Sequence, residues 1–337
     1  MSDIFPVSQS VLSASSLMTD VLCHYEVGIP TECKLLARGL NDTYVVVSES
    51  GKYALRIYRN EWRSESEILF EQDALLHLGR EGVSVSKPIL RKDGRIAGRV
   101  TAPEGPRHVV LFQYAQGEPQ TYEDEAEEES YLYGKSVARI HAATDTFRSS
   151  HHRFTLDLDH LLTLPLQACE PFLAHRKEDW KYIEGFAGRL RSIIQDFPSD
   201  RLEFGFCHGD FHGGNAHVDK NAALTFFDFD CCGAGWRAYD IAVFRWSARL
   251  RGKEKERWPS FIRGYTDQRP LSEIDLRSIP YFVAIRHLWI LGLHTGNSHD
   301  WGIGWLNDAY FDRAIKFFRE WESEFLIERS TDKNTAI

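Results

Sequence analysis

Several common sequence features are missing, and each absence argues against a class of protein. The six cysteines include no C-x-x-C pair, and no basic and then apolar signal segment follows the early Asp3, so we expect reduced cysteines in a cytoplasmic protein. The best apolar stretch, residues 281–293, is too short to cross a bilayer and is interrupted by Arg286 and His287. We therefore expect no membrane segment.

Net positive charge and glycine-rich phosphate loops are also missing. The formal charge of -9 and the pI near 5.9 argue against a nucleic-acid-binding surface. Neither G-x-G-x-x-G nor the P-loop pattern G-x-x-x-x-G-K-S/T occurs. A short turn, GLNDT from Gly39 to Thr43, lies between two β-rich runs. We expect this turn to cover the phosphates of a nucleotide through Gly39 and Asn41.

The chain is long enough for two lobes, because its 337 residues are about twice the usual ~150 per domain. Apolar spacing predicts helices over residues 10–26, 64–78, 131–143 and 180–195, and short β-rich runs predict strands over residues 35–37, 43–48, 53–58, 83–89, 95–100 and 108–114. We expect an α+β fold of two lobes. Residues 1–116 would form a nucleotide-binding lobe with a leading helix, an antiparallel sheet and one further helix. Residues 117–330 would form a mostly helical catalytic and acceptor-binding lobe, and residues 331–337 a polar tail.

The most informative segment is HGDFHGGN at residues 208–215, which is followed by DFD at residues 228–230. Asp210 and Asn215 have the spacing of the aspartate and asparagine in the H-R-D-x-x-x-x-N loop of kinases, and Asp228 stands where a second, metal-holding aspartate is required. Residues 216–227 read as two strands around a tight turn. Such a hairpin would return Asp228 beside Asn215, so the sequence predicts phosphoryl transfer.

Phosphoryl transfer needs these residue types because its catalysis is mostly positioning and charge neutralisation. We expect Asp210 to orient the acceptor hydroxyl and accept its proton. Asn215 and Asp228 would hold Mg²⁺, which prefers oxygen ligands and needs only one or two protein groups. Two roles stay open: His212 either contacts phosphate or braces the loop, and Asp230 either joins the metal site or supports the next turn.

The first lobe should supply the groups that hold ATP. In the strand predicted over residues 53–58, Leu55 and Ile57 face one way and Arg56 the other, so Arg56 can project into a cleft where kinases place a phosphate-binding lysine. Glu71 falls on the apolar stripe of the following helix, where a carboxylate needs a cation. We expect an Arg56–Glu71 pair at the phosphates, unless Glu71 lies at the edge of the stripe and reaches water.

Together, GLNDTYVV, ALRIYR, the Glu71 helix, LFQYAQGEP, YGKSVARIHAA, HGDFHGGN, FFDFD and WRAYDIAVF resemble the aminoglycoside phosphotransferase and choline kinase family over about residues 35 to 250. Type II homoserine kinases and stress-response Ser/Thr kinases share these motifs. The resemblance implies a protein-kinase-like fold and ATP-dependent phosphorylation of a hydroxyl. It supports the roles given above and further implies that Gln113, Tyr114 and Ala115 lie at the adenine and that Asp240 braces the catalytic loop. The family often has lysine where Arg56 stands.

The acceptor side lies after Tyr281, where the resemblance thins. We expect Arg286, His294, Asp300 and Trp301 to contact the acceptor, because convergent aromatic and polar groups suit a sugar or an amino alcohol and a carboxylate can meet an ammonium. The alternative is a structural loop whose tryptophans pack the second lobe.

Three functions remain open. The first is a kinase that uses ATP and Mg²⁺ to phosphorylate a hydroxyl of a small molecule, such as an amino alcohol, a sugar or an aminoglycoside. The second is a protein serine/threonine kinase that applies the same groups to a peptide. The third is a non-catalytic nucleotide-binding module. Neither the identity of the acceptor nor the oligomeric state follows from the sequence.

Overall fold

The computed structural model of the chain describes residues 5–119, 126–198 and 201–326, which divide into two units. The N-terminal unit contains residues 5–119, 146–153 and 216–230, and the C-terminal unit contains the other described residues. Two later segments thus pack with the N-terminal unit, whereas the sequence predicts continuous lobes. The lobe boundary at residue 116 stays a prediction, and the predicted tail lies outside the described residues.

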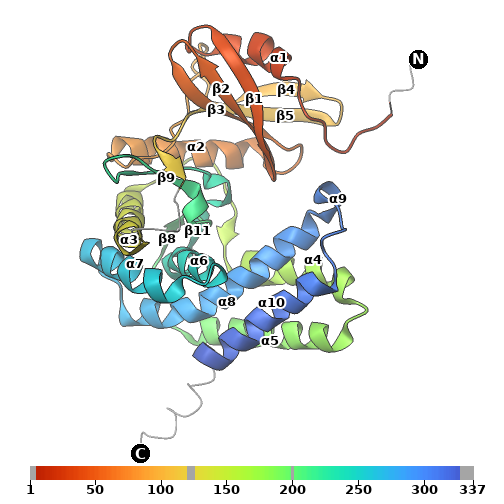
Figure 1. Cartoon of the computed structure of the whole chain (residues 1–337), viewed down its shortest axis with the longest axis vertical. Helices are drawn as coiled ribbons and strands as arrows, with labels where there is room; N and C mark the ends of the chain where they lie inside the picture. The colour runs from red at the N-terminus through yellow and green to blue at the C-terminus, as the bar shows by residue number, and fades with distance from the viewer. Residues whose placement is uncertain (1–4, 120–125, 199–200, 327–337) are drawn as a thin grey trace, which may run out of the picture. The chain divides into compact units, whose positions relative to one another are not determined.

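The N-terminal unit is built on a five-stranded antiparallel sheet in the order β1-β2-β3-β5-β4 (Figure 1). Side chains of the second strand alternate between buried and partly exposed, as in a strand with one face against a core. The predicted antiparallel meander is confirmed. The strands are β1 (Pro30–Arg38), β2 (Asn41–Ser48), β3 (Gly51–Tyr58), β4 (Gly98–Ala102) and β5 (Gly105–Gln113).

The strand predicted over residues 83–89 is wrong. This segment makes only isolated bridges, through Val85 to Phe226 and through Pro88 to Phe112. Its backbone bonds go to three different elements, α2 (Glu65–Arg80), β5 and β10 (Leu224–Phe226), and Pro88 has no N–H to donate to a ladder. The segment is therefore an extended connection that packs against three neighbours.

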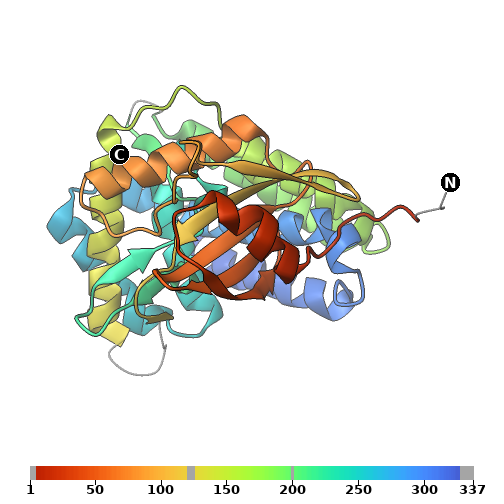
Figure 2. The same ribbon diagram turned by 90° about the horizontal axis from the view of Figure 1, so that it is seen from above.

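The two faces of the sheet are covered by different helices. Leu55 and Ile57 of β3 lie in a buried core with Leu17 and other residues from the start of the chain. There, the helix predicted over residues 10–26 is present over residues 14–24, as α1 (Ala14–Ser16) continued by a π-helical segment (Leu17–Val21) and a 3-10 segment (Leu22–His24). Helix α1 lies over the sheet in Figure 2. Arg56 points to the opposite face, where its guanidinium meets α2 (Glu65–Arg80).

Helix α2 begins where the sequence predicts. The Ser64 hydroxyl accepts a hydrogen bond from the N–H of Glu67, and the Glu67 carboxylate accepts one from the N–H of Ser64. This capping box stabilises the first turn by about 1 kcal/mol. Glu71, two turns later, is fully buried, so the alternative in which its carboxylate reaches water is wrong.

A strap of eight residues, 146–153, fastens α2 within the N-terminal unit. The Phe147 ring packs edge-on against Phe70, with centroids 5.3 Å apart. The Ser149 hydroxyl donates to Asp73 at 2.6 Å, and the Arg153 guanidinium donates to the Glu67 carbonyl at 2.8 Å. These contacts span almost two turns of the helix and fix the position from which Glu71 reaches the sheet.

The predicted hairpin after the HGDFHGGN loop is confirmed. Strands β9 (Ala216–Val218) and β10 (Leu224–Phe226) pair antiparallel, with Ala216 opposite Phe226, and β6 (Glu118–Pro119) pairs with the outer edge of β9. The hairpin belongs to the N-terminal unit. It joins the end of the catalytic loop directly to the strand that precedes Asp228.

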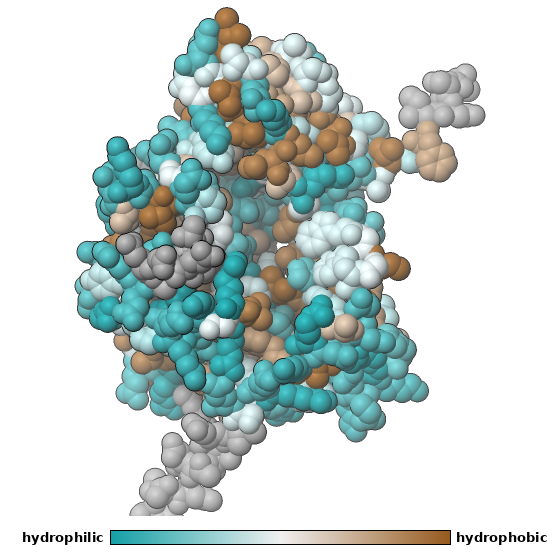
Figure 3. Space-filling view, in the orientation of Figure 1, coloured by the Kyte–Doolittle hydropathy of each residue, from teal (hydrophilic) through white to brown (hydrophobic). Residues whose placement is uncertain are grey.

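The C-terminal unit is mostly helical, as predicted, with a small sheet in the order β7-β11-β8. Its surface over the helices in Figure 3 is mostly hydrophilic. Within the described ranges, no helix is long and apolar enough to cross a membrane. The elements are α3 (Ala126–Ala143), β7 (Thr155–Leu156), α4 (Leu164–Leu173), α5 (Lys177–Asp196), β8 (Phe204–Cys207), β11 (Gly233–Trp236), α6 (Arg237–Leu250), α7 (Glu254–Gln268), α8 (Glu273–Gly296), α9 (Ser298–Trp301) and α10 (Asp308–Trp321).

Candidate active site

The catalytic loop places the Asp210 carboxylate between a cation and an amide. Arg286 of α8 donates from Nη2 to Oδ1 of Asp210 and from Nη1 to the Gly209 carbonyl at 3.1 Å. Asn215 donates from Nδ2 to Oδ2 of Asp210 at 3.1 Å and to the Asp210 carbonyl at 3.0 Å. The Asp210 side chain keeps 19% of its surface exposed. The carboxylate is thus oriented on both sides and still accessible.

The charge of Asp210 follows from these neighbours. Burial alone would raise the pKa of its carboxyl, but the Arg286 guanidinium and, to a smaller extent, the imidazoles of His212 and His208 hold the pKa below its usual range. Asp210 is therefore a carboxylate at neutral pH. It can accept a hydrogen bond from a hydroxyl without first losing a proton of its own.

Asp240 of α6 holds the start of the loop. It is fully buried, and its two carboxylate oxygens accept hydrogen bonds from the backbone N–H groups of His208 and Gly209, both at 2.7 Å. The imidazole of His141, in the YGKSVARIHAA segment, lies 3.1 Å from Asp240 Oδ2. These bonds are those of a brace for the loop, the role that the resemblance implies for Asp240.

The two histidines of the motif lie on the C-terminal unit with their δ nitrogens used by the loop backbone. His208 Nδ1 accepts from the N–H of Asp210 at 3.2 Å, and His212 Nδ1 accepts from the N–H of Gly214 at 3.0 Å. His212 also carries its Nε2 3.5 Å from Asp210 Oδ2. Both imidazoles therefore support the conformation of the loop, and contact between His212 and phosphate stays a prediction.

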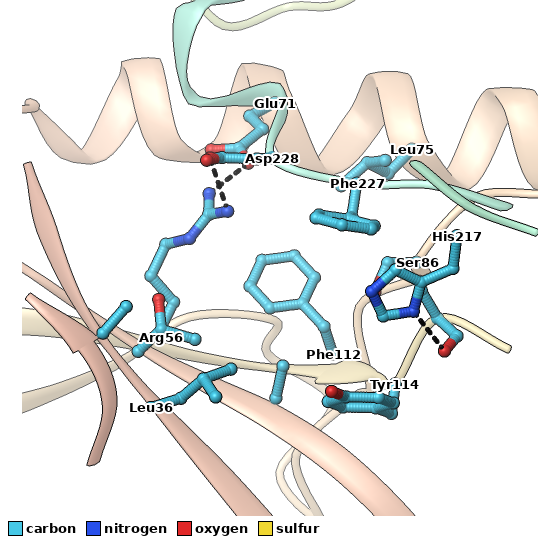
Figure 4. Close-up of a pocket in the computed structure, with 14 residues that line it drawn as sticks. Leu36, Arg56, Glu71, Leu75, Ser86, Phe112, Tyr114, His217, Phe227 and Asp228 are labelled. Atoms are coloured by element: carbon cyan, nitrogen blue, oxygen red, sulfur yellow. Dashed lines mark hydrogen bonds and ion pairs between the residues drawn. The ribbon is translucent and has the colours of Figure 1, made fainter. Parts of the chain in front are cut away.

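The N-terminal unit contains a cavity of about 220 Å³ (Figure 4). Side chains from the sheet, from α2, from the end of β5 and from the β9–β10 hairpin surround it. The lining is apolar in one part and charged in the other, a combination that suits a ligand with a flat base and anionic groups. The residues that line it are Leu36, Ala37, Thr43, Ala54, Arg56, Glu71, Leu75, Ser86, Phe112, Tyr114, Ala115, His217, Phe227 and Asp228.

Arg56 joins the two carboxylates of this cavity. Its Nη1 donates to Glu71 at 2.8 Å and its Nη2 donates to Asp228 at 2.9 Å. Tyr58 donates to the second oxygen of Glu71 at 2.8 Å. Burial opposes the charge of both Arg56 and Glu71, yet the two neighbouring carboxylates keep the pKa of Arg56 well above its ordinary value. The predicted ion pair between Arg56 and Glu71 is present.

Arg56→Lys tests whether the planar fork matters. Lysine keeps the positive charge, but a single ammonium replaces two guanidinium nitrogens that each bind a separate carboxylate. We expect a loss of about 1.5–3 kcal/mol in the free energy of unfolding, the value of one hydrogen bond to a charged group, and weaker ATP binding. Urea unfolding and isothermal titration with ATP measure the two effects. An unchanged urea midpoint would show that one contact suffices.

Asp228 and Asp230 have different surroundings. Asp228 adopts a left-handed backbone with φ of 63°, and its side chain is 47% exposed. Asp230 is buried and accepts hydrogen bonds from the Trp62 indole at 2.9 Å and from the Arg63 guanidinium at 3.3 Å. Burial would raise the pKa of Asp230, but Arg63, Arg153 and Arg56 hold it below the usual range. Asp230 therefore has the contacts of a supporting residue, and Asp228 is the carboxylate with room for a ligand.

The groups available to a divalent cation are oxygens. The amide nitrogen of Asn215 donates to Asp210, so the carbonyl oxygen Oδ1 is the atom of this side chain that could bind a cation. Asp228 bonds to Arg56 through Oδ1 and keeps Oδ2. Each of these atoms is an oxygen donor of the kind that Mg²⁺ prefers. Within the described ranges no group of three His, Cys, Asp or Glu side chains could hold a metal ion.

Some residues predicted at the nucleotide are not on the wall of the cavity. Gly39, Asn41 and Gln113 do not line it, although Tyr114 and Ala115 do. The GLNDT turn is held in place by the buried Arg107, whose guanidinium donates to the Asp42 carboxylate at 2.8 Å. A role for Gly39 and Asn41 at the phosphates stays a prediction.

The predicted acceptor residues lie in two places on the C-terminal unit. Arg286 is buried against Asp210. His294, at the end of α8, bonds to the Tyr310 hydroxyl at 2.7 Å and packs edge-on against Trp301 and Trp305. Burial and the charge of Arg286 lower the pKa of His294 to about 4, so the imidazole is neutral at pH 7. Asp300 lies in α9 beside His299, and its Oδ2 is 3.5 Å from the Nε2 of His299.

Sequence reasoning missed His217 and missed the partner of Arg286, which it predicted at the acceptor. The contact between Arg286 and Asp210 could have been suspected from a lone charge in the apolar stretch 281–293, because such a charge needs a counter-charge nearby. His217, one residue into β9, lines the cavity. Its only sequence signal was its place in a strand next to the motif.

Comparison with known proteins agrees with this geometry. The profile of the phosphotransferase enzyme family matches residues 32–270. A protein of Deinococcus radiodurans is 38% identical over 322 residues, which covers 94% of this chain and 92% of that protein. Among solved structures, amicoumacin kinase in complex with AMP-PNP and Ca²⁺ superposes with a TM-score of 0.75 and 22% identity over 93% of this chain and 94% of that chain. The microcompartment-associated aminopropanol kinase superposes with a TM-score of 0.72 and 24% identity, over 94% of this chain and 98% of that chain. The chain therefore has the protein-kinase-like fold, belongs to the phosphotransferase enzyme family and is a kinase.

Proposed function

We propose that the protein transfers the terminal phosphoryl group of ATP to a hydroxyl of a small molecule. The observation that carries this proposal is the Asp210 carboxylate, which is held anionic and oriented by Arg286 and Asn215. Oδ1 is paired to Arg286, and Oδ2 accepts one hydrogen bond from Asn215. A carboxylate oxygen can accept two hydrogen bonds, so Oδ2 can also receive the acceptor hydroxyl and, during transfer, its proton. Because the reaction consumes ATP, we propose the cytoplasm as its place.

The donor nucleotide would occupy the cavity of the N-terminal unit. The apolar part, with Phe112 and Phe227, suits the base, while Arg56 suits the phosphates. The Arg56–Glu71 pair is already formed, and the strap of residues 146–153 holds α2 in place. These contacts support a site that needs little rearrangement before it binds ATP.

We further propose that Asn215 and Asp228 hold Mg²⁺. Bound there, the cation would neutralise charge on the phosphates. One support is that both side chains offer oxygen atoms. The other is the register of the hairpin: Ala216 pairs with Phe226, Asn215 directly precedes Ala216, and Asp228 lies two residues after Phe226. The chain's own contribution would be one carboxamide oxygen and one carboxylate oxygen.

The class of acceptor is proposed from the relatives and from the end of α8. Amicoumacin kinase and aminopropanol kinase are named for small molecules, and an aminopropanol is an amino alcohol. We propose that His294, Trp301 and Asp300 face the acceptor. Neutral aromatic faces with one carboxylate suit an amino alcohol or an amino sugar better than an acidic compound.

The test is an acceptor panel with purified protein, ATP and Mg²⁺. Amino alcohols, sugars, aminoglycosides and serine- or threonine-containing peptides are each incubated, and phosphorylated product is measured by mass spectrometry. We expect a phosphorylated small molecule that does not form when Mg²⁺ is chelated. Phosphorylation of peptides alone would favour the protein kinase. Binding of ATP with no product from any acceptor would contradict the proposal.

A further inference from the structure

Several backbone groups next to Tyr114, at one part of the cavity, already form hydrogen bonds within the N-terminal unit. The carbonyl of Gln113 accepts a hydrogen bond from the Ser86 hydroxyl, and the N–H of Gln113 donates to the Lys87 carbonyl at 2.8 Å. The N–H of Tyr114 donates to the Lys52 carbonyl at 3.3 Å. The N–H and carbonyl of Gln113 and the N–H of Tyr114 are thus occupied within the unit, so a side chain that lines the cavity can add to the recognition of a base.

His217 offers such a group. Its Nδ1 lies 3.1 Å from the Ala115 carbonyl, which can only accept, so Nδ1 must carry the hydrogen. In the neutral imidazole the other nitrogen, Nε2, then has a lone pair and no hydrogen. Figure 4 shows this nitrogen turned toward the interior of the cavity. Among the described residues, none forms a hydrogen bond with Nε2.

The ring is fixed in this orientation. His217 is 9% exposed, and the Phe227 ring meets it edge-on with centroids 4.9 Å apart. The hydrogen bond to Ala115 sets the tautomer, and Phe227 blocks rotation. An oriented acceptor that lines a cavity loses its access to water when a ligand fills the cavity, and this is costly unless the ligand brings a donor to it.

We infer that His217 selects the base of the nucleotide, by accepting a hydrogen bond at Nε2 from the 6-amino group of adenine. This inference rests on the proposed function, since it assumes that the cavity holds the nucleotide. Adenine carries a donor at position 6, whereas guanine carries a carbonyl oxygen there. The guanine oxygen would face the lone pair of Nε2 with no hydrogen between them, so ATP is preferred to GTP.

Two substitutions separate base recognition from support of the Ala115 carbonyl. In His217→Asn the amide falls near the position of Nδ1, so it can still donate to Ala115 but cannot reach the base. In His217→Gln the amide falls near the position of Nε2, so it can meet the base but releases Ala115. The two side chains are otherwise alike in chemistry, and each serves as the control for the other.

The measurement is the dissociation constant of ATP and of GTP, each with Mg²⁺ and without acceptor, by isothermal titration. We expect the unchanged protein to bind ATP at least about tenfold more tightly than GTP, the effect of one unpaired buried polar group. His217→Asn should weaken ATP binding and bring the two constants within about threefold. His217→Gln should keep its affinity for ATP and gain affinity for GTP, because an amide can turn either its oxygen or its nitrogen toward the base.

The opposite pattern, with His217→Asn unchanged and His217→Gln impaired, would overturn the inference and leave His217 as a support for Ala115. Equal binding of ATP and GTP by the unchanged protein would overturn it as well, without touching the proposed phosphoryl transfer. Binding of neither nucleotide would overturn both. Thermal melting of each variant confirms that it is folded before binding is compared.

Discussion

Asp210→Asn should lower kcat by about 10²–10⁴-fold, the usual contribution of a positioned general base. Asparagine has nearly the same shape, and its amide oxygen can still accept the hydrogen bond from Arg286. What it loses is the negative charge and the ability to receive the proton of the acceptor hydroxyl. The KM for ATP should change little, because Asp210 does not line the nucleotide cavity.

The assay follows product formation with the best acceptor at saturating ATP and Mg²⁺. Asp196→Asn is the matched control, because Asp196 is exposed at the end of α5 and undergoes the same chemical change. A melting curve separates loss of catalysis from loss of structure. If Asp210→Asn stays folded and retains more than about a tenth of kcat, Asp210 is not the base.

The parts of the site that could be predicted from the sequence are those whose residues lie close together in short motifs or in one strand or helix. The spacing of Asp210 and Asn215 reflects one turn of backbone that lets the amide reach the carboxylate, and the structure shows that hydrogen bond. Period-two alternation placed Arg56 on the face opposite Leu55, and the helical stripe placed Glu71 among apolar residues. In these cases local geometry alone determines the neighbour.

Contacts between distant segments could not be read in the same way. Nothing in the local pattern of residues 146–153 shows that they fasten α2, because the contacts depend on where the chain returns after α3. The strand predicted over residues 83–89 failed for a related reason, since its partners are three different elements. His217 reads only as a strand residue until the hairpin brings it to Ala115.

Arg286 is the clearest of these distant contacts. It lies in α8 among buried apolar residues, 76 positions from Asp210 in the sequence. A guanidinium in such surroundings is stable only beside a counter-charge. The sequence alone predicts Arg286 at the acceptor and does not show which carboxylate lies beside it. The structure identifies Asp210, and this couples the stability of α8 to the catalytic loop.

Arg286→Met should cost about 3 kcal/mol in the free energy of unfolding, the lower end of the range for breaking a buried ion pair, because Asp210 keeps some exposure to water. Methionine fills similar volume but leaves the carboxylate without its cation, so the pKa of Asp210 should rise and its orientation should loosen. Urea unfolding gives the stability, and steady-state kinetics should show a lower kcat with little change in the KM for ATP.

Arg286→Lys separates the charge from the geometry. Lysine retains the cation but cannot bind both Asp210 and the Gly209 carbonyl with a planar fork, so it should restore most of the stability and only part of kcat. Arg313→Met, on the exposed face of α10, controls for the general loss of an arginine. If Arg286→Met lowers stability while kcat stays normal, the contact holds the helix only. If Arg286→Lys recovers kcat fully, charge alone orients the base, because the second hydrogen bond to Gly209 would then contribute nothing to the reaction.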